Sequence, residues 1–309
     1  MKLAVVLPAF NEEQTIALTI EDFHTHLPNA EIWVVNNRSS DNTENVANEA
    51  IARLGCKGKV INERRPGKGN AVRRAFLEIN ADVYVLADAD MTYPAAQVEQ
   101  LIAPILAGEA DMVVGDRHSN GRYAAENKRA LHGFGNKLVK WLVNKLFKAN
   151  LADIMSGYRV FNRRFVKNYP ILVQGFEIET DMTLHALDKR FRIIELPIEY
   201  KDRPFGSFSK LNTLRDGIKV VYTVATVLRY YRPLTFFGSL ALIFCLLGLL
   251  AGTPVVSDWL QEGYVHHIPL AILATGLEVV SIVFLAIGLI LDSITHQDKR
   301  RFEQGLLND

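Results

Sequence analysis

The chain has 309 residues, of which 49% are hydrophobic and 22% are charged, and its 35 Lys and Arg residues nearly balance 34 Asp and Glu residues. This balance argues against a nucleic-acid-binding protein, which usually carries a clear basic excess. Together with a mean hydropathy of +0.07, the charged fraction excludes a disordered chain. The two cysteines, Cys56 and Cys245, stand in polar and apolar surroundings respectively, so they supply neither a disulfide framework nor a cysteine-rich zinc site.

Residues 1–200 alternate short apolar runs with helical patterns. Strands rich in Val and Ile are predicted at 3–7, 31–35, 60–62, 83–87 and 112–114, and helices at about 12–26, 41–54, 67–79 and 95–107. This alternation implies an α/β fold with a mostly parallel sheet and helices on both faces. In such a fold, ligands bind beyond the carboxyl ends of the strands.

Polar residues follow the first two predicted strands. The first strand leads into residues 8–12, Pro-Ala-Phe-Asn-Glu, where Asn11 is expected to cap a helix that begins near Glu13. Simple strand-to-helix punctuation would explain this segment equally well. The second strand leads into residues 36–41, Asn-Asn-Arg-Ser-Ser-Asp, whose side chains suit the recognition of a base or a ribose, a weak signal by itself.

A lysine between two glycines, in Gly67-Lys68-Gly69, comes before a predicted helix. Backbone N–H groups at a helix N-terminus favour anions, and a lysine adds a positive charge. The segment is not a Walker A loop, because the spacing and the Ser or Thr of that motif are absent. A phosphate-binding role and a flexible cationic surface turn both stay open at this point.

Two aspartates, Asp88 and Asp90, come directly after the apolar run at 83–87. Carboxylates two residues apart on an extended backbone point to the same side, so both can reach one hard cation. A divalent cation held there can bridge a diphosphate and neutralise the charge on a leaving nucleotide. Chance also produces this spacing, as at 177–181, but the position after a buried strand favours a ligand role.

The last third of the chain changes character. Residues 233–257 carry no charge, and residues 268–291 carry only Glu278. Each run is long enough to cross a hydrocarbon core of about 30 Å, which takes about 20 residues. A pair of buried core helices is the alternative interpretation. Because a carboxylate inside a bilayer is costly, we expect Glu278 to face the partner helix or another subunit, which leaves a homo-oligomer open.

The charges that flank these two runs predict their orientation. Arg229 and Arg232 precede the first run, and Lys and Arg residues follow the second at 299–301, whereas the connector carries none. The positive-inside rule therefore places both termini in the cytoplasm. Residues 214–232 combine apolar residues at helical spacing with positive charges, which predicts an amphipathic helix lying either on the membrane surface or on the soluble part.

Taken together, the clusters at 8–12, 36–41, 65–71 and 88–90 resemble those of the family 2 glycosyltransferases, which have the GT-A fold and use nucleotide sugars. Later segments narrow the resemblance to the branch of dolichol-phosphate mannose synthases and polyprenyl-phosphate glucosyltransferases. These segments are Gly115-Asp116-Arg117, Arg129, Asp153 to Arg159, and Gly206 to Leu211. The Q-x-x-R-W segment of the processive polysaccharide synthases is absent.

The resemblance covers about residues 1–213, and the apolar C-terminal hairpin also suits this branch. It implies a GT-A-like catalytic domain at 1–213, an amphipathic juxtamembrane helix at 214–232, and two transmembrane helices with a cytoplasmic tail at 233–309. The expected location is a bacterial inner membrane, with the catalytic domain on the cytoplasmic side.

The resemblance also implies which residues bind the donor and the cation. The donor would be bound by residues at the strand ends, namely Pro8, Ala9, Phe10, Glu12, Asn37, Lys68, Asp88, Ala89 and Asp90. Among these, Asp88 and Asp90 would hold Mg²⁺ or Mn²⁺ on the donor diphosphate.

The catalytic residues implied by the resemblance handle a phosphate. They are Asp90, Arg117, Arg129, Asp153, Glu179 and Lys210. Arg117 and Arg129 would grip the acceptor phosphate, and Lys210 would close over the donor diphosphate. Asp153 and Glu179 would lie near the reaction centre.

The implied reaction is the inverting transfer of a sugar from a UDP- or GDP-linked donor to a membrane polyprenyl phosphate. A phosphate with a second pKa near ~6 is largely dianionic at neutral pH and needs no general base. Transfer to a hydroxyl of a glycan or glycolipid stays open, with Asp153 or Glu179 as the base. A membrane scaffold with a degenerate nucleotide-binding domain also stays open, although the intact pair Asp88 and Asp90, together with Lys210, speaks against it.

Two positions depart from the family pattern. Relatives usually carry paired aspartates where this chain has Asn36 and Asn37, which leaves the nucleotide base open. Dolichol-phosphate mannose synthases often carry Gln where this chain has Thr92, so we expect one metal ligand to be missing or replaced by water.

Overall fold

The structure is a computed structural model, and its description covers residues 1–119, 130–175, 177–200 and 223–307. The chain divides into two compact units, Met1–Leu211 and Asn212–Asp309, and each is described by itself. The predicted site residues Arg129 and Lys210 lie outside the described residues. So does most of the predicted helix at 214–232, of which residues 223–231 are helical.

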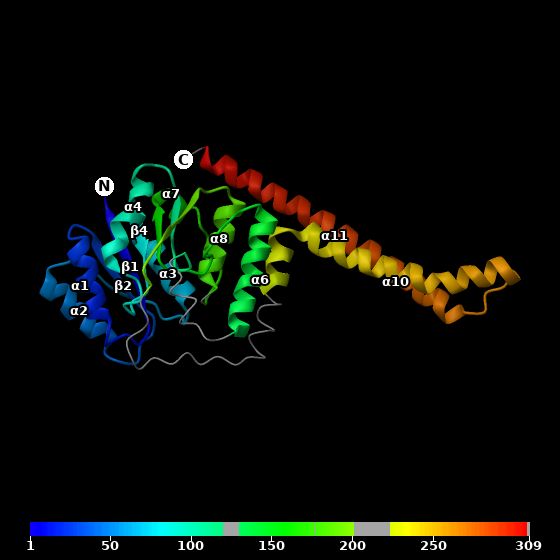
Figure 1. The fold of residues 1–309 in the computed structure, drawn as a ribbon, viewed down its shortest axis with the longest axis horizontal. Helices are drawn as coiled ribbons and strands as arrows, with labels where there is room; N and C mark the ends of the chain where they lie inside the picture. The colour runs from blue at the N-terminus through cyan, green and yellow to red at the C-terminus, as the bar shows by residue number, and fades with distance from the viewer. Residues whose placement is uncertain (120–129, 176, 201–222, 308–309) are drawn as a thin grey trace. The chain divides into compact units, whose positions relative to one another are not determined.

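The first unit is built on a sheet that is mostly parallel (Figure 1). The strands formed by the described residues are β1 Leu3–Ala9, β2 Glu31–Asn36, β3 Lys57–Asn62, β4 Val83–Leu86, β5 Met112–Asp116, β6 Arg159–Asn162 and β7 Ile193–Pro197. Their order is β3-β2-β1-β4-β6-β5-β7, and β6 runs antiparallel to both of its neighbours. This order confirms the predicted α/β architecture.

Helices pack on both faces of the sheet. In the first unit the described helices are α1 Ile16–His26, α2 Thr43–Leu54, α3 Lys68–Glu78, η1 Ala95–Gln97, α4 Val98–Leu106, α6 Ala130–Phe147, α7 Arg163–Lys167 and α8 Ile178–Asp188. On one face, Val5 of β1 belongs to a buried cluster with Ile20 of α1. On the other, the Phe76 ring of α3 lies 5.8 Å, centroid to centroid, from both Tyr84 and Phe161. Burial on both faces explains why these strands are almost continuously apolar.

Among the described residues of the first unit, the sequence prediction missed two strands and the three helices α6, α7 and α8, and it misplaced one helix start. The periodicity missed β7 and also β6, which has only four residues and begins with the fully buried Arg159. The predicted cap at Asn11 is wrong, because α1 begins only at Ile16, directly after Thr15. Asn11 instead adopts a left-handed φ of 57°, and its Oδ1 accepts a hydrogen bond from the Ser40 N–H at 2.8 Å.

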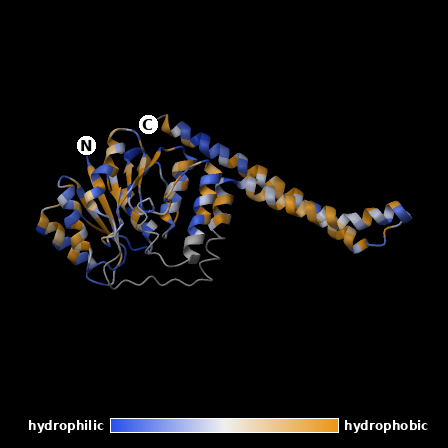
Figure 2. Cartoon of the chain, viewed as in Figure 1, coloured by the Kyte–Doolittle hydropathy of each residue, from blue (hydrophilic) through white to orange (hydrophobic). Residues whose placement is uncertain are grey.

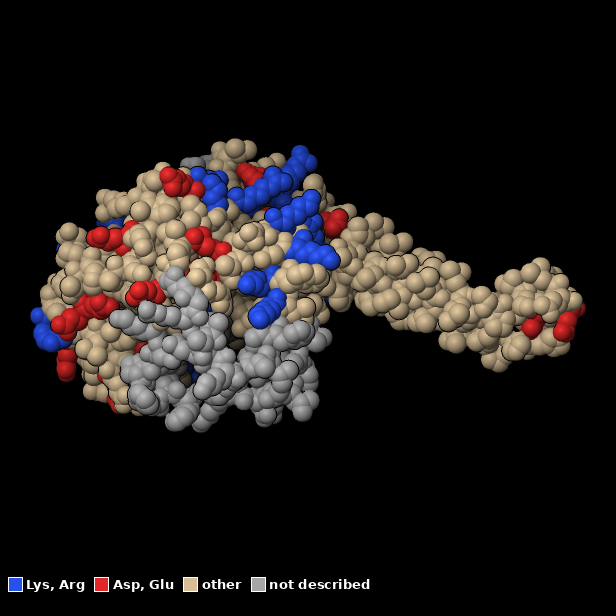
Figure 3. Space-filling model, in the orientation of Figure 1, with Lys and Arg blue, Asp and Glu red and all other residues tan. Residues whose placement is uncertain are grey.

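The second unit contains two long apolar helices, α10 Pro233–Glu262 and α11 Ile268–Leu306. Figure 2 shows them hydrophobic along most of their length, with hydrophilic residues at the connecting turn and in the last turns of α11. In the view of Figure 3, no charged side chain is visible along the middle of this hairpin. Both helices are long and apolar enough to cross a membrane, and only 11% and 6% of their most apolar windows are buried, which contradicts the alternative of core helices.

Glu278 of α11 faces α10, as predicted. A Cβ added at Gly248 would lie 2.6 Å from the Glu278 Oε1, so a glycine is needed to leave room for the carboxylate. A polar contact joins the helices where the Ser281 hydroxyl donates to the Ala241 carbonyl oxygen at 2.8 Å. These contacts are of the kind that hold helices together in lipid, where small residues let the backbones approach.

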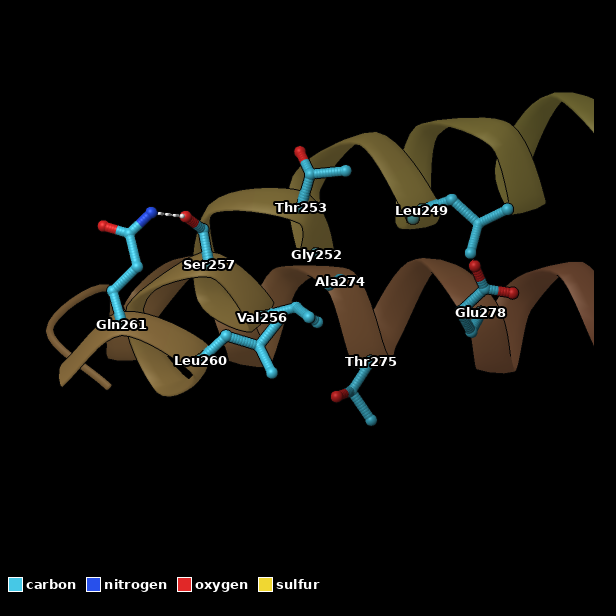
Figure 4. Close-up of a pocket in the computed structure, with 11 residues that line it drawn as sticks. Leu249, Gly252, Thr253, Val256, Ser257, Leu260, Gln261, Ala274, Thr275 and Glu278 are labelled. Atoms are coloured by element: carbon cyan, nitrogen blue, oxygen red, sulfur yellow. Dashed lines mark hydrogen bonds between the residues drawn. The ribbon is translucent and has the colours of Figure 1, made fainter. Parts of the chain in front are cut away.

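A groove of 720 Å³ opens between the two helices on the side of Glu278 nearer the connecting turn (Figure 4). Pro254 of α10 lies in sequence between the groove-lining residues Thr253 and Val256, and it lacks the N–H that would bond the Leu250 carbonyl. The Thr253 hydroxyl donates to that carbonyl oxygen at 2.7 Å instead, so the helix continues through the proline. The helix ends at Gly263, which has a left-handed φ of 66°.

Candidate active site

The polar clusters that follow β1, β2 and β4 meet at one edge of the sheet. These strands are parallel neighbours, so their carboxyl ends lie side by side. The pairing continues into the clusters, where the Asn37 N–H donates to the Ala9 carbonyl at 2.9 Å and the Ala87 N–H to the Val6 carbonyl at 3.2 Å. The strand order reverses direction between β1 and β4, which is where ligands bind in open α/β sheets.

The end of β1 and the residues that follow it form a partly exposed segment of this edge. Pro8 and Ala9 are the last two residues of the strand, and Phe10 exposes 60% of its surface. Glu12 is fixed in place because its N–H donates to the Thr43 hydroxyl oxygen at 2.9 Å. The Glu12 carboxylate also accepts from the Thr15 hydroxyl at 3.0 Å, and an anchored carboxylate two residues from an exposed aromatic ring suits the stacking and hydrogen bonding that a nucleoside requires.

Asn37 is buried and holds the segment that leads to the glycine loop. Its Nδ2 donates to the Arg65 carbonyl at 2.7 Å and to the Glu63 carbonyl at 3.3 Å. Its Oδ1 accepts from the Gly67 N–H at 2.8 Å. The side chain is therefore engaged with the backbone of the 63–67 segment, and we assign it to positioning this loop.

The two glycines around Lys68 are required by a close backbone approach. A Cβ at Gly67 would collide with the Gln174 carbonyl oxygen, and one at Gly69 with the Val173 carbonyl oxygen. Gly67 also has a φ of 113°, which side-chain-bearing residues rarely adopt. The alternative of a flexible surface turn is therefore wrong, because this loop is packed against residues 173–174 and carries Lys68 into the interior.

Lys68 forms a buried ion-pair cluster with two carboxylates. Its Nζ contacts the Asp88 Oδ1 and lies 2.5 Å from the Glu179 Oε1 of α8, and only 7% of the lysine side chain is exposed. Burial alone would lower the pKa of Lys68, but the charges of Asp88 and Glu179 outweigh it and raise that pKa well above its usual value. Lys68 therefore stays protonated and fixes both carboxylates.

Asp90 is the more deeply buried of the two aspartates that follow β4. Its exposure is 5%, and its Oδ1 accepts from the Thr92 hydroxyl at 2.6 Å and the Thr92 N–H at 3.2 Å. The Ala89 carbonyl between the pair accepts from the Thr19 hydroxyl at 3.1 Å. Thr92 therefore orients the Asp90 carboxylate.

The donor atoms of this pair suit a hard divalent cation. Within the described ranges, no three His, Cys, Asp or Glu side chains gather in a way that could hold a metal ion. Mg²⁺ is usually bound through one or two carboxylates, with substrate phosphates and waters completing the octahedron. Asp88 and Asp90 fit a cation of this kind, one that is shared with the diphosphate of a bound donor.

Arg117, which directly follows β5, forms a bidentate pair with Asp153. The Arg117 Nε lies 2.7 Å from Asp153 Oδ2 and its Nη2 lies 3.0 Å from Oδ1, and the guanidinium stacks 5.6 Å from the Tyr200 ring centroid. The Asp153 side chain is 1% exposed. Burial would raise the pKa of Asp153, but the Arg117 hydrogen bonds and charge lower it below the ordinary 3.8.

Three residues that were not predicted from the sequence to belong to the site stabilise this arrangement. Glu195 of β7 accepts hydrogen bonds from the N–H groups of Ala152 at 2.6 Å and Asp153 at 2.8 Å. The Arg159 guanidinium donates to the carbonyls of residues 154 and 156, both at 2.8 Å. The Tyr93 hydroxyl oxygen accepts from the Gly157 N–H at 2.9 Å. Only Arg159 had a signal, because it ends the Asp153-to-Arg159 segment, and the other two become visible only when the chain is folded.

The comparisons with known proteins agree with this geometry. The family profile described as Glycosyl transferase family 2 matches residues 4–169, just over half of the chain. Glycosyltransferase AglJ of Haloferax volcanii is 28% identical over 98% of this chain and 97% of that protein. An undecaprenyl-phosphate mannosyltransferase of Micrococcus luteus is 26% identical over 67% of this chain and 86% of its own.

A solved structure shares the fold. Glucosyl-3-phosphoglycerate synthase from Mycobacterium tuberculosis, crystallised with Mn²⁺, UDP and phosphoglyceric acid, superimposes with a TM-score of 0.56. The two sequences are 22% identical, and the match covers 74% of this chain and 77% of that one. This likeness confirms the GT-A architecture of the first unit.

Proposed function

This chain belongs to the family 2 glycosyltransferases, and we propose that it transfers a sugar from a nucleotide-sugar donor to a membrane polyprenyl phosphate, with inversion at the anomeric carbon. The names of relatives support this acceptor class, among them the undecaprenyl-phosphate mannosyltransferase. The two apolar helices support it as well, because an enzyme anchored in a bilayer is held next to an acceptor whose lipid tail stays there.

One observation favours a phosphate over a hydroxyl as the acceptor group. Both carboxylates that could deprotonate an alcohol are already ion-paired, Asp153 with Arg117 and Glu179 with Lys68. Asp153 is the poorer base still, because its pKa is held below its ordinary value. A phosphate needs no base, since it is already largely dianionic at neutral pH. The remaining task is to hold the nucleophile and stabilise the leaving group.

In the proposed reaction, a phosphate oxygen of the lipid attacks the anomeric carbon while the bond from that carbon to the donor diphosphate breaks. The products are the polyprenyl-phosphate sugar and a nucleoside diphosphate. A guanidinium has five N–H donors, and Asp153 fixes its plane by taking the Nε and Nη2 sides of Arg117. The acceptor phosphate would bind this oriented group. Lys68 fixes Asp88 on the donor side, and a divalent cation held by Asp88 and Asp90 would neutralise the leaving diphosphate.

The product identifies the acceptor class. The full chain, reconstituted in lipid nanodiscs with polyprenyl phosphate, is offered a panel of radiolabelled UDP- and GDP-sugars, and labelled lipid is extracted into organic solvent. We expect label to enter the organic phase only when polyprenyl phosphate is present. Label that enters with polyprenol or a glycolipid, while polyprenyl phosphate fails, would instead establish the hydroxyl-transfer alternative. No transfer with any donor would favour the scaffold alternative.

The charge asymmetry around the hairpin predicts its topology in the membrane. In a chain whose two cysteines are replaced by Ser, we expect Gln261→Cys, near the connecting turn, to react with a membrane-impermeant thiol reagent added to intact cells. The matched variant Gln304→Cys, exposed near the end of α11, should react only after permeabilisation. The reverse pattern would overturn the proposed cytoplasmic location of the catalytic unit.

A further inference from the structure

Helix α6 presents an outward stripe of lysines around a tryptophan. Lys137, Trp141 and Lys145 follow one another at spacings of four residues, so they lie on one side of the helix, and Lys148 directly follows the last helical residue. All four side chains are exposed, and Trp141 exposes 55% of its surface. The Lys145 Nζ lies 4.7 Å from the centroid of the Trp141 ring. Residues 130–150 contain no Asp or Glu.

The opposite side of α6 is fastened to the catalytic unit. Val139 and Val143 are buried, with 3% and 0% exposure. Two residues that flank the stripe add polar anchors: Asn144 makes two hydrogen bonds of 3.0 Å with the backbone of Leu151, and the Lys140 ammonium donates to the Ala152 carbonyl at 3.2 Å. The helix is therefore held firmly, and the stripe defined above is the face that it turns away from the unit.

The chemistry of this stripe fits an anionic lipid surface. Lysines are attracted to anionic headgroups, and their aliphatic stems let the ammonium groups extend past an apolar neighbour. Tryptophan is the residue most suited to the headgroup level, because one part of its ring system is apolar and the other donates a hydrogen bond. A purely solvated helix face usually mixes both signs of charge, whereas this one is only positive.

We propose that the stripe of Lys137, Trp141, Lys145 and Lys148 docks the catalytic unit on an anionic membrane surface. A chain with two helices that can cross a membrane always has a bilayer within reach, so no additional partner is needed. This contact is separate from the hairpin and from the predicted amphipathic helix at 214–232.

The docked helix is connected to the acceptor side of the active site. Lys140 and Asn144 hold residues 151–152, and the next residue, Asp153, forms the bidentate pair with Arg117. Contact of α6 with headgroups would therefore set the position of Arg117 relative to the lipid phosphates. This consequence rests on the proposed function, whereas the docking itself does not.

The test of docking uses the fluorescence of a single tryptophan. The full chain carrying Trp33→Phe and Trp259→Phe is reconstituted in nanodiscs that contain phosphatidylglycerol, with or without brominated acyl chains. We expect brominated lipid to quench Trp141 emission by about half or more, and about 0.5 M KCl to weaken this effect, because salt screens the attraction.

Two charge-matched variants separate the stripe from overall charge. Lys137→Gln, Lys145→Gln and Lys148→Gln together should abolish the quenching. Lys2→Gln, Lys57→Gln and Lys59→Gln together remove the same charge from exposed positions elsewhere and should leave it intact. Retained donor binding reports that each variant is folded. Trp141 emission that brominated lipid does not quench would overturn the proposal and leave a solvated or protein-binding face.

The link to the acceptor has its own readout. The stripe variant should raise the apparent KM for a long-chain polyprenyl phosphate in anionic nanodiscs about tenfold, and leave the KM for a water-soluble short-chain prenyl phosphate unchanged. An equal effect on both acceptors would contradict the link. If neither acceptor is used, the proposed function fails, but the quenching experiment still decides the docking.

Discussion

The substitution Asp90→Asn should lower kcat/KM by at least about 100-fold, which corresponds to ~2.7 kcal/mol of transition-state stabilisation. Asp90 is 5% exposed, and Thr92 holds its carboxylate in place at the end of β4. An amide of the same shape keeps the packing but loses the negative charge that a divalent cation requires. Steady-state kinetics with the labelled donor, at saturating Mg²⁺ or Mn²⁺, measure the effect.

The matched control lies at the other end of the same strand. Asp82 immediately precedes β4, and its carboxylate accepts a hydrogen bond from the Lys2 N–H at 2.7 Å. Asp82→Asn therefore removes an aspartate beside the same strand without touching the carboxyl edge, and it should keep nearly normal turnover. Removal of divalent cations by a chelator should abolish activity of the unmodified protein, and Mg²⁺ or Mn²⁺ should restore it. Full turnover in excess chelator would refute the role assigned to Asp88 and Asp90.

The second large effect concerns the acceptor. Arg117→Ala should lower kcat/KM for polyprenyl phosphate by about 100-fold or more while the dissociation constant of the donor changes little. The reason is that a guanidinium can bind a phosphate through two charge-assisted hydrogen bonds, which alanine cannot replace. Arg117→Lys should restore only part of the activity, because it keeps the charge but loses the fork.

This substitution also removes the bidentate partner of the buried Asp153, and breaking a buried ion pair typically costs about 3–5 kcal/mol of folding free energy. The double variant Arg117→Ala with Asp153→Asn removes the unpaired charge, so it should recover stability without recovering acceptor use. Arg192, which pairs with Asp111 through Nε at 3.2 Å, is the matched control. Arg192→Ala breaks a similar pair at the amino end of β5 and should leave acceptor kinetics unchanged. Unaltered acceptor kinetics in Arg117→Ala, or loss of donor binding instead, would remove the assignment.

The same pair predicts a dependence of stability on pH. The folded-state pKa of Asp153 lies below its unfolded value, so its ion pair stabilises the protein above the ordinary pKa of 3.8 and the contribution is lost as the pH falls through the folded pKa. In Arg117→Ala, the strongest of the interactions that lower this pKa is lost and His118, at 3.8 Å, remains, so the pKa of Asp153 rises relative to that in the unmodified protein. Thermal melting of this variant in detergent should therefore shift upward as the pH falls towards 5, relative to the unmodified protein.

The local sequence pattern was sufficient to predict the elements whose own residues show a clear apolar periodicity or a long uncharged run. The strands from β1 to β5 and the helices from α1 to α4 follow from apolar periodicity, because each buries a continuous run or a stripe of neighbouring residues. The hairpin follows from length and absence of charge, since lipid imposes those two conditions on any helix that crosses it. The clusters after β1, β2 and β4 follow as well, because parallel strands bring their carboxyl ends to one edge.

The tertiary structure alone decided how the site residues are used. From the sequence, Lys68 is expected to be an exposed phosphate ligand. In the structure it is a buried anchor for Asp88, because residues 173–174 pack against its loop and Glu179, about 110 positions away, pairs with it. Asp153 reads as a candidate base, but Arg117 neutralises it. Composition and residue spacing show which chemical groups the chain contains and where each strand ends. Whether a charge is free or paired depends on which distant segment packs against it, and no local pattern carries that information.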